Sequence, residues 1–200
     1  MLATPSQRDG EQIEAMSKVH EKKSDRDLLA EQFATPNALR MLVVTMSDRA
    51  SAGVYEDKSG PRLRTHIEDF FSGSGIGTSI ESTILTDDAK GLREALEQAK
   101  RDGVHVVFTT GGTGVGPRDN TPDVVLAMAD KTIPGIMELI RMKYGADKPC
   151  ALISRTVAAT LGTMLVYTLP GSTKGVDEYM GEILKSIEHV LCVLHGLDAH

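Results

Sequence analysis

A short apolar run that leads directly into a glycine-rich loop constrains the fold of this 200-residue chain more than any other feature. The run covers residues 104–108, and residues 109–123 then read TTGGTGVGPRDNTPD. An apolar run of this length is typical of a buried strand. Thr121 followed by Pro122 is typical of an N-cap and the first residue of a helix. The segment therefore predicts a strand, a glycine loop and a helix in direct succession.

Glycines at the start of a helix are suited to binding an anion. Without Cβ atoms the backbone adopts positive φ and lets a phosphate come close, and the free N–H groups of the helix attract negative charge. Glycine runs also form plain tight turns, so the loop alone leaves both interpretations open. It is not a P-loop, because Gly116 is followed by Pro117, and it does not lie in the first strand-to-helix turn, as a dinucleotide fingerprint does.

Apolar periodicity predicts alternating strands and helices outside this loop. Residues 40–47 and 81–85 are expected to be strands, each followed by a helix with apolar residues at helical spacing. With the strand at 104–108 and the helix after the loop, the order becomes β-α-β-α-β-α. Such an order implies a mostly parallel sheet covered by helices.

The last quarter of the chain predicts an antiparallel addition to the sheet. Residues 151–154, 156–161 and 163–169 are strand-like, and Gly162 between the last two is typical of a hairpin. One strand is therefore expected to run antiparallel, which makes the sheet mixed at one side. A final helix is predicted over residues 176–194.

Composition bounds the domain organisation and the cellular context. Residues 1–36 are polar with sparse apolar residues, so we expect a flexible N-terminal extension before a single domain at 37–200. A net charge of -6 with dispersed Lys and Arg disfavours a nucleic-acid partner. No apolar run approaches the roughly 20 residues that span a bilayer. We therefore expect no membrane partner. Cys150 and Cys192 are predicted to be packed free thiols, which suits a cytoplasmic protein.

Three separated segments carry a resemblance to one protein family. They are residues 47–60 (SDRASAGVYEDKSG), residues 109–122 (TTGGTGVGPRDNTP), and residues 169–172 (LPGS) with Lys174. Residues 134–135 (PG) and 154–155 (SR) also fit. Ordered agreement at several motifs is much more specific than one glycine loop. The chain resembles the molybdopterin adenylyltransferases and their close relatives in molybdenum cofactor biosynthesis, the MogA/MoaB-like group.

The resemblance implies a fold, an assembly and a reaction. The fold is a three-layer α/β/α, molybdopterin-binding-like domain with a mostly parallel, mixed sheet, and its members usually form homotrimers. The reaction is the Mg-ATP-dependent adenylylation of molybdopterin with release of pyrophosphate, for which Mg²⁺ and fixed N–H dipoles balance the phosphate charges. A molybdenum-insertion enzyme is the expected partner. A non-catalytic molybdopterin-binding carrier or scaffold of the same pathway is the alternative function, since a shared fold does not guarantee activity.

Two acidic residues are the expected catalytic and metal-binding groups. Asp119 matches the family's acid after the glycine loop and is expected to hold Mg²⁺ or its water shell, although it also suits the dipole of a helix N-terminus. Asp87 matches the family's second acid, although it is also a plausible N-cap. Arg118 is expected either to neutralise phosphate or to pair with Asp119.

Further residues are expected to contact phosphate, pterin or nucleotide. The glycine loop and the later turn contribute Gly111, Gly112, Thr113, Gly114, Ser172 and Lys174. The family commonly has Pro where this chain has Thr173, which changes the expected shape of that turn. Asp57 and Lys58, with Asp48, lie in the first strand-to-helix loop. They order nucleotide or metal there, or they cap the next helix and carry solvated charge.

Overall fold

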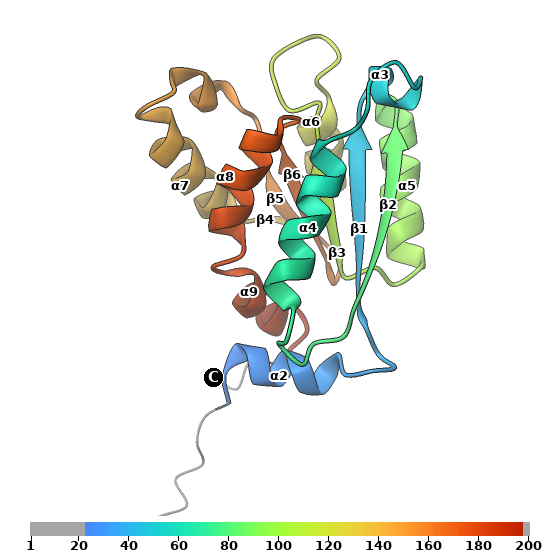
Figure 1. The fold of residues 1–200 in the computed structure, drawn as a ribbon, viewed down its shortest axis with the longest axis vertical. Coiled ribbons are helices and arrows are strands. Elements are labelled where there is room, and N and C mark those ends of the chain that lie inside the picture. The colour runs from blue at the N-terminus through green and yellow to red at the C-terminus, as the bar shows by residue number, and fades with distance from the viewer. Residues whose placement is uncertain (1–22, 198–200) are drawn as a thin grey trace, which may run out of the picture.

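Six strands form one mixed sheet in the computed structural model, which describes residues 23–197. Their order across the sheet is β2-β1-β3-β6-β5-β4 (Figure 1). The first four strands of this order are parallel, whereas β5 pairs antiparallel with both β6 and β4. The strands are β1 (Leu39–Met46), β2 (Thr78–Leu85), β3 (Val106–Thr110), β4 (Lys131–Thr132), β5 (Ala158–Leu161) and β6 (Met164–Leu169).

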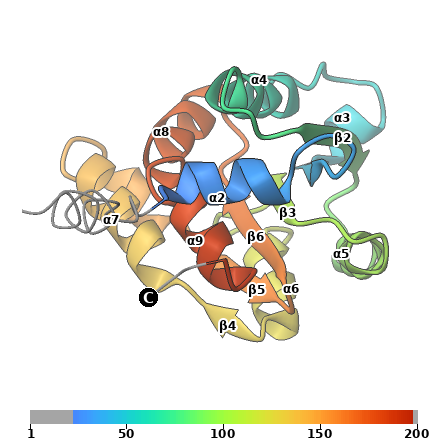
Figure 2. The ribbon, with the colours of Figure 1, turned by 90° about the horizontal axis from the view of Figure 1, so that it is seen from below.

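Helices cover both faces of this sheet (Figure 2). Buried residues of α2, α4, α7, α8 and α9 share one apolar cluster, and those of α5 and α6 share another on the opposite face. The helices are α2 (Asp25–Gln32), α3 (Asp48–Ser51), α4 (Ser59–Phe71), α5 (Ala89–Arg101), α6 (Thr121–Met128), α7 (Pro134–Gly145), the 3-10 helix η1 (Pro149–Ile153), α8 (Thr173–Ile183) and α9 (Ile187–Leu194).

Alternate residues of each central strand pack against the two helical layers. In β1, Met41 and Val43 join the cluster of α4 and α8, whereas Val44 and Met46 join the cluster of α5 and α6. The period of two follows from the pleat, which points successive side chains to opposite faces. The three-layer α/β/α fold with a mostly parallel, mixed sheet is thereby confirmed.

The region around β5 confirms one prediction and corrects two. Gly162 has φ of +67°, which other residues avoid, and it joins β5 to β6 in the predicted antiparallel hairpin. The predicted strand at 151–154 is wrong, because the N–H of Ala151 turns back to the Lys148 carbonyl at 2.8 Å and begins η1 instead of pairing with a strand. Consequently Cys150 is exposed, and only Cys192 is the buried thiol that was expected.

The predicted final helix is divided into α8 and α9. The N–H of Ser186 donates to the Ile183 carbonyl at 3.1 Å, and the Ser186 hydroxyl donates to the same carbonyl at 3.3 Å. A serine hydroxyl that bonds a nearby carbonyl competes with the helical ladder. The chain therefore turns at residues 184–186 before α9 starts.

A packed helix precedes β1, within the segment expected to be a flexible extension. Leu29 of α2 is 0% exposed and Phe33 is 3% exposed, so both belong to the core that the sequence pattern did not predict for them. The helix that packs against α2 is α9, which is distant in sequence. The remainder of the predicted extension, residues 1–22, lies outside the described residues, and the domain boundary at 36–37 stays a prediction.

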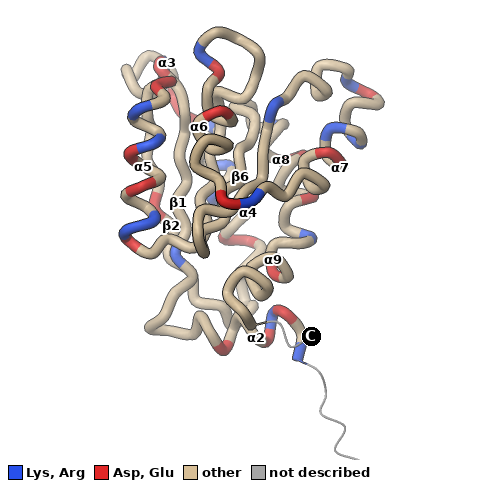
Figure 3. The backbone as a smooth tube through the Cα atoms, turned by 180° about the vertical axis from the view of Figure 1, so that it is seen from behind, with Lys and Arg blue, Asp and Glu red and all other residues tan. Residues whose placement is uncertain are grey.

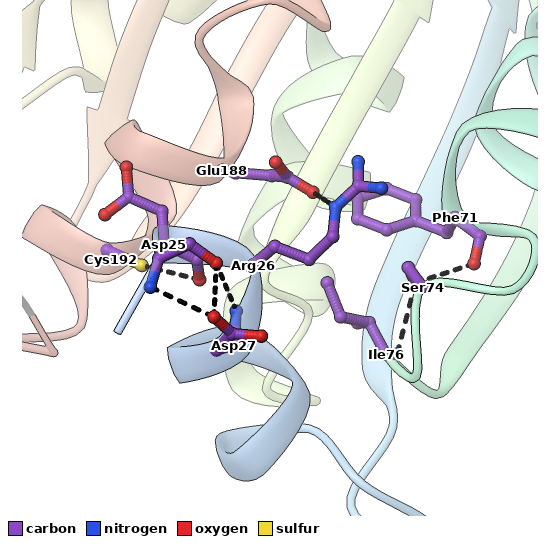
Figure 4. A network of polar contacts seen from close by, with 9 residues as sticks. Asp25, Arg26, Asp27, Phe71, Ser74, Ile76, Glu188 and Cys192 are labelled. Atoms are coloured by element: carbon purple, nitrogen blue, oxygen red, sulfur yellow. Dashed lines mark hydrogen bonds and ion pairs between the residues drawn. The ribbon is translucent and has the colours of Figure 1, made fainter. Parts of the chain in front are cut away.

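Polar contacts fix α2 to the body of the molecule (Figure 4). The Ser24 hydroxyl accepts the N–H of Asp27 at 3.2 Å, which caps the helix N-terminus. Arg26 donates to Glu188 of α9 at 2.7 Å, and the Cys192 thiol donates to the Asp25 carbonyl at 3.3 Å. These contacts join α2 to α9 at the end of the sheet opposite the arrowheads of β1 and β2 in Figure 1.

The described surface shows no concentration of basic residues on one element. Lys and Arg are scattered over several elements, and α5 carries both signs along its length (Figure 3). Across residues 23–197, none of the helices combines the length and apolar character needed to cross a membrane.

Candidate active site

The carboxyl ends of the parallel strands open on one cleft of about 620 Å³. Its walls are the end of β1 with the turn after it, the glycine loop after β3, and the turn after β6, together with Asp87 after β2. These connections lie at the upper end of Figure 1. β2 lies on one side of β1 and β3 on the other, so the direction in which strands are added reverses after β2, and open α/β sheets bind ligands at such a reversal of the strand order.

Glycine is required at two positions of the loop. Gly111 has φ of +104°, and a β-carbon there would lie 2.3 Å from the Met46 carbonyl oxygen of β1. Gly112 has φ of +64°, and its β-carbon would lie 2.5 Å from Thr121 Oγ1. The N–H of Gly111 donates to the Leu169 carbonyl at 3.0 Å, so the loop is fixed to β6. The loop therefore approaches β1 and β6 more closely than any side chain would allow.

Asp119 lies across the glycine loop. Its Oδ2 accepts the N–H of Gly116 at 2.8 Å and would lie 2.7 Å from a β-carbon on Gly114. Its Oδ1 accepts no hydrogen bond from any residue between 23 and 197. One carboxylate oxygen thus shapes the loop, and the other is left for a ligand.

Asp87 is held by a reciprocal pair of hydrogen bonds to Asp48. The N–H of Asp48 donates to Asp87 Oδ2 at 3.1 Å, and the N–H of Asp87 donates to Asp48 Oδ1 at 3.1 Å. The pair joins the turns after β1 and β2. Asp87 Oδ1 lies 3.8 Å from where a β-carbon of Gly112 would be, and it also accepts no hydrogen bond within the described chain. Asp87 and Asp119 therefore both adjoin the glycine loop.

The helix caps differ from the predicted ones by one residue. The N-cap of α5 is Asp88, whose carboxylate accepts the N–H of Gly91 at 2.7 Å, so the capping alternative for Asp87 is wrong. The N-cap position of α6 is Asn120, and the predicted cap Thr121 is the first helical residue. In the described chain the buried Thr121 hydroxyl has no hydrogen-bond partner.

Arg118 pairs with Asp48 and not with Asp119, the acid named as its partner in the sequence analysis. Its guanidinium lies 2.7 Å from Asp48 Oδ2, and no ion pair with Asp119 occurs in the part of the chain that the structure describes. Both side chains are substantially exposed, at 64% and 39%, so the pair contributes little stability. Arg118 is therefore available to exchange Asp48 for an incoming phosphate.

Asp57 lines the cleft, but both its carboxylate oxygens are already occupied. Oδ2 accepts the Thr45 hydroxyl at 2.6 Å, and Oδ1 accepts the N–H groups of Ser59 and Gly60 at 2.9 and 3.1 Å. Burial raises the pKa of Asp57, yet these hydrogen bonds outweigh burial and hold it below its ordinary value. The contacts match the capping interpretation. Lys58 occupies the N-cap position of α4 and is not part of the cleft wall.

Ser172 lies between the cleft and a second pocket of about 340 Å³. Its hydroxyl accepts the N–H of Gly175 at 3.1 Å and caps α8. Lys174 lines the second pocket and not the cleft. Tyr179 also lines this pocket, where its hydroxyl bonds Ser154 at 3.1 Å. Sequence reasoning missed this pocket and the place of Tyr179 in it, because the apolar spacing of residues 176–194 indicates packing in the core or in a subunit contact.

The acids of the cleft fit a hydrated magnesium ion better than a metal held by protein alone. No group of three or more His, Cys, Asp or Glu side chains within residues 23–197 is placed to hold a metal. Magnesium usually takes one or two carboxylates and completes its shell with water and substrate phosphates. The unoccupied oxygens of Asp87 and Asp119 supply that number.

Together the fold and the cleft define a class of protein: an α/β domain whose strand ends present a glycine loop, a helix N-terminus and two carboxylates to a phosphate-bearing ligand. Residues 42–189 match the model of the family described as the probable molybdopterin binding domain. The chain belongs to this family.

Named relatives and solved structures are similar over most of the chain. It is 36% identical to the molybdopterin adenylyltransferase of Escherichia coli (strain K12) over 164 residues, which cover 82% of each protein. It is 31% identical to a molybdenum cofactor biosynthesis bifunctional protein of Synechococcus elongatus, over 85% of this chain and 50% of that protein. A solved structure of MogA superposes with a TM-score of 0.71 and 34% identity, covering 78% of this chain and 99% of MogA.

Proposed function

We propose that the protein catalyses the Mg-ATP-dependent adenylylation of molybdopterin, with pyrophosphate as the second product. One observation carries the proposal: Asp87 and Asp119 adjoin the glycine loop at the start of α6, and each keeps one carboxylate oxygen free of hydrogen bonds within the described chain. The similarity to the E. coli molybdopterin adenylyltransferase, 36% over 82% of the chain, supports it.

The reaction forms one bond and breaks another at the same phosphorus. A terminal phosphate oxygen of molybdopterin attacks the α-phosphorus of ATP, and the bond to the oxygen that bridges to the β-phosphate breaks. That oxygen leaves with the electron pair as part of pyrophosphate. The protein's task is to bring anionic groups together, so fixed dipoles are its main contribution. We assign this task to the N–H groups of residues 111–114 and of the first turn of α6.

Asp87, Asp119 and Arg118 are assigned to the remaining phosphate charge, the two acids through a bound cation and the arginine directly. Asp87 and Asp119 would hold Mg²⁺ through their free oxygens or its water shell. When bound, the ion neutralises phosphate charge and orients the leaving group. Asp48 fixes the backbone and carboxylate of Asp87 through the reciprocal pair. Arg118, released from Asp48, would then pair with a phosphate oxygen.

The two pockets provide separate places for two substrates. The larger cleft carries the carboxylates, so we assign it to the nucleotide and its metal. The second pocket has Ile153, Pro170 and Tyr179 in its wall, which suits a flat heteroaromatic pterin. Ser172 lines both pockets, and Lys174 lies in the second, so we assign them to the molybdopterin phosphate between the two. Asp57 holds the loop before α4 and Lys58 is left without a ligand role.

We further propose a cytoplasmic homotrimer that works with a molybdenum-insertion enzyme. The side chains of Leu139 and Met142 on α7 and of Leu152 and Ile153 on η1 are 51–70% exposed. Exposed apolar groups on adjacent elements are typical of a subunit contact. The Synechococcus relative is a bifunctional protein, and this chain matches half of that protein's length, which supports a partner enzyme that acts together with this domain.

Met142→Glu places a charge in the proposed subunit contact and should lower the mass measured by light scattering from that of a trimer to that of a monomer.

The test of the proposed reaction is product formation. Purified protein is mixed with molybdopterin and Mg-ATP, and adenylylated molybdopterin is sought by mass spectrometry. Asp119→Ala is the loss-of-function variant, and Asp69→Ala, the same change at an exposed acid on α4, is the matched control. Product from the parent and the control, but not from Asp119→Ala, supports the transferase. Molybdopterin that binds without product overturns it and favours the carrier or scaffold.

A further inference from the structure

We propose that Arg155 is a positioning residue that clamps the glycine loop and thereby places Asp119 for the reaction. The proposal rests on the proposed function, because it concerns the same acid. Arg155 lies between η1 and β5, outside the walls of both pockets. It therefore acts through the loop and does not contact substrate.

Four hydrogen bonds join Arg155 to its surroundings, three to the glycine loop and one to the helix that follows it. Its Nε donates to the Gly114 carbonyl at 2.7 Å, and its main-chain N–H donates to the Thr113 carbonyl at 3.0 Å. One terminal nitrogen, Nη2, donates to the carbonyl of Asp119 itself. The other, Nη1, donates to Asp123 in the first turn of α6 at 2.8 Å. One side chain thus connects the start of the loop, the acid at its end and the helix that follows.

Apart from Arg155, the main-chain anchors of the loop lie at its two ends: the N–H of Gly111 donates to the Leu169 carbonyl at 3.0 Å, and the N–H of Thr121 donates to the Gly112 carbonyl at 3.1 Å. The hydrogen bonds between Asp119 and Gly116 fix these two residues only to one another. The ion pair of Arg118 with Asp48 is exposed and therefore weak. Residues 115–118 are themselves exposed. Arg155 is the side chain that ties this projecting segment to the region before β5.

The contact needs the shape of a guanidinium. A planar fork of five N–H donors reaches three acceptors in different directions at once, whereas the ammonium of lysine is a compact charge on a flexible stem. Arg155→Lys keeps the charge and cannot make the same three side-chain contacts. Asp123→Asn removes only the ion pair and leaves both loop carbonyls bonded, so it separates charge pairing from clamping.

A matched arginine is available as a control. Arg141 of α7 donates through Nη1 to the Thr156 carbonyl at 3.1 Å, one residue beyond Arg155, and makes no hydrogen bond to the glycine loop in the described structure. Arg141→Lys therefore repeats the same chemical change beside the same segment without loosening the loop.

The first measurement is amide hydrogen exchange of residues 111–123, followed by mass spectrometry, in the parent, Arg155→Lys, Asp123→Asn and Arg141→Lys. We expect exchange in this peptide to be about tenfold faster in Arg155→Lys alone, since local opening sets the exchange rate. Unchanged exchange in Arg155→Lys overturns the clamp, whether or not the protein is a transferase. Equally fast exchange in Asp123→Asn or across the whole chain overturns it as well, because it indicates charge pairing or general destabilisation.

The second measurement is the dependence of turnover on Mg²⁺ concentration. A displaced Asp119 keeps its carboxylate, so Arg155→Lys should lose about 10²-fold in rate, the cost of a small misplacement, and regain part of it at high Mg²⁺. Asp119→Ala lacks the ligand and should regain none. Identical Mg²⁺ profiles for Arg155→Lys and the parent overturn the positioning role. Absence of turnover in the parent instead contradicts the proposed function and leaves the hydrogen-exchange result to decide the clamp.

Discussion

At the scale of single residues, the cleft is held by contacts between segments far apart in sequence. The main-chain N–H of Asp48 donates to the carboxylate of Asp87, 39 positions away, and the N–H of Asp87 donates to the carboxylate of Asp48. The candidate residues themselves could be named from local motifs, since the acids and glycines stand in recognisable order. Their partners could not, because Arg118 pairing with Asp48 depends on which strands become neighbours.

Replacing Asp119 by Asn should abolish most turnover and leave the fold intact. The amide keeps one oxygen and the size of the side chain but loses the charge that holds a cation, so we expect at least a 10²-fold fall in kcat, as for loss of one preorganised electrostatic group. Steady-state kinetics and a thermal melt measure the two effects. A variant with full turnover would remove Asp119 from the mechanism.

Gly111→Ala should destabilise the protein by about 1–3 kcal/mol and disrupt ligand binding, because a β-carbon would meet the Met46 carbonyl at a strained, positive φ. Urea unfolding measures the change. Gly181→Ala is the control: it lies on the exposed side of α8 with nothing within 4 Å of the new carbon. That variant should be more stable by about 0.5–1 kcal/mol. Equal stability of the two variants would contradict the steric account of the loop.

At the scale of elements, α2 is where sequence reasoning and structure differ most. Its apolar residues are few, and a helix of eight residues has little stability of its own. What orders it is burial of Leu29 and Phe33 against α9 and the central sheet. Such long-range packing leaves no periodic signal in the short segment. The elements of the sheet, in contrast, carry enough apolar residues to be predicted one by one.

Leu29→Ala should cost about 2–5 kcal/mol, the usual range for a fully buried leucine that leaves a cavity. Leu28→Ala, at its half-buried neighbour, should cost clearly less. Both are measured by denaturant unfolding monitored by circular dichroism. If α2 were a loose extension, as its sequence suggests, neither substitution would change the midpoint.

Two histidines beside α2 should make the stability depend on pH. Phe33 packs edge-on against His105 and His195, with ring centroids 4.9 and 5.7 Å away. Burial lowers the pKa of both imidazoles below 6.5, and the charges of His195 and Arg40 lower that of His105 further. The neutral rings are favoured in the fold, so this stability is complete above pH 6.5 and is lost as the pH falls through the lowered pKa values.

The check is the free energy of unfolding between pH 8 and pH 5 for the parent and His105→Asn. The Asn oxygen can accept the N–H of Arg40, as His105 Nδ1 does at 2.9 Å, but it does not titrate. The decline below pH 6.5 should be shallower in the variant. The lowered pKa values of carboxylates such as Asp57 act only at more acidic pH, near and below 3.8. An unchanged slope in His105→Asn would contradict the assignment.

At the scale of the whole molecule, the strand order brings the connections after β1, β2, β3 and β6 to one edge. This placement could be predicted, because parallel strands with right-handed crossovers put their carboxyl ends together. The division of that edge into two pockets could not, since it depends on η1, which the sequence pattern presented as a strand. The hydrogen bonds of Arg155 to the glycine loop could not be predicted either, because they form only once η1 has turned the chain back toward the loop before β5.

The most direct measurement of the central claim is a single turnover with ATP labelled at either the α- or the γ-phosphate. Transfer of an adenylyl group predicts that the α-label enters a molybdopterin product and that the γ-label is released in pyrophosphate. Both transfers should require Mg²⁺ and the Asp119 carboxylate. Recovery of the γ-label as inorganic phosphate, with no α-label on molybdopterin, would show ATP hydrolysis and would contradict the account.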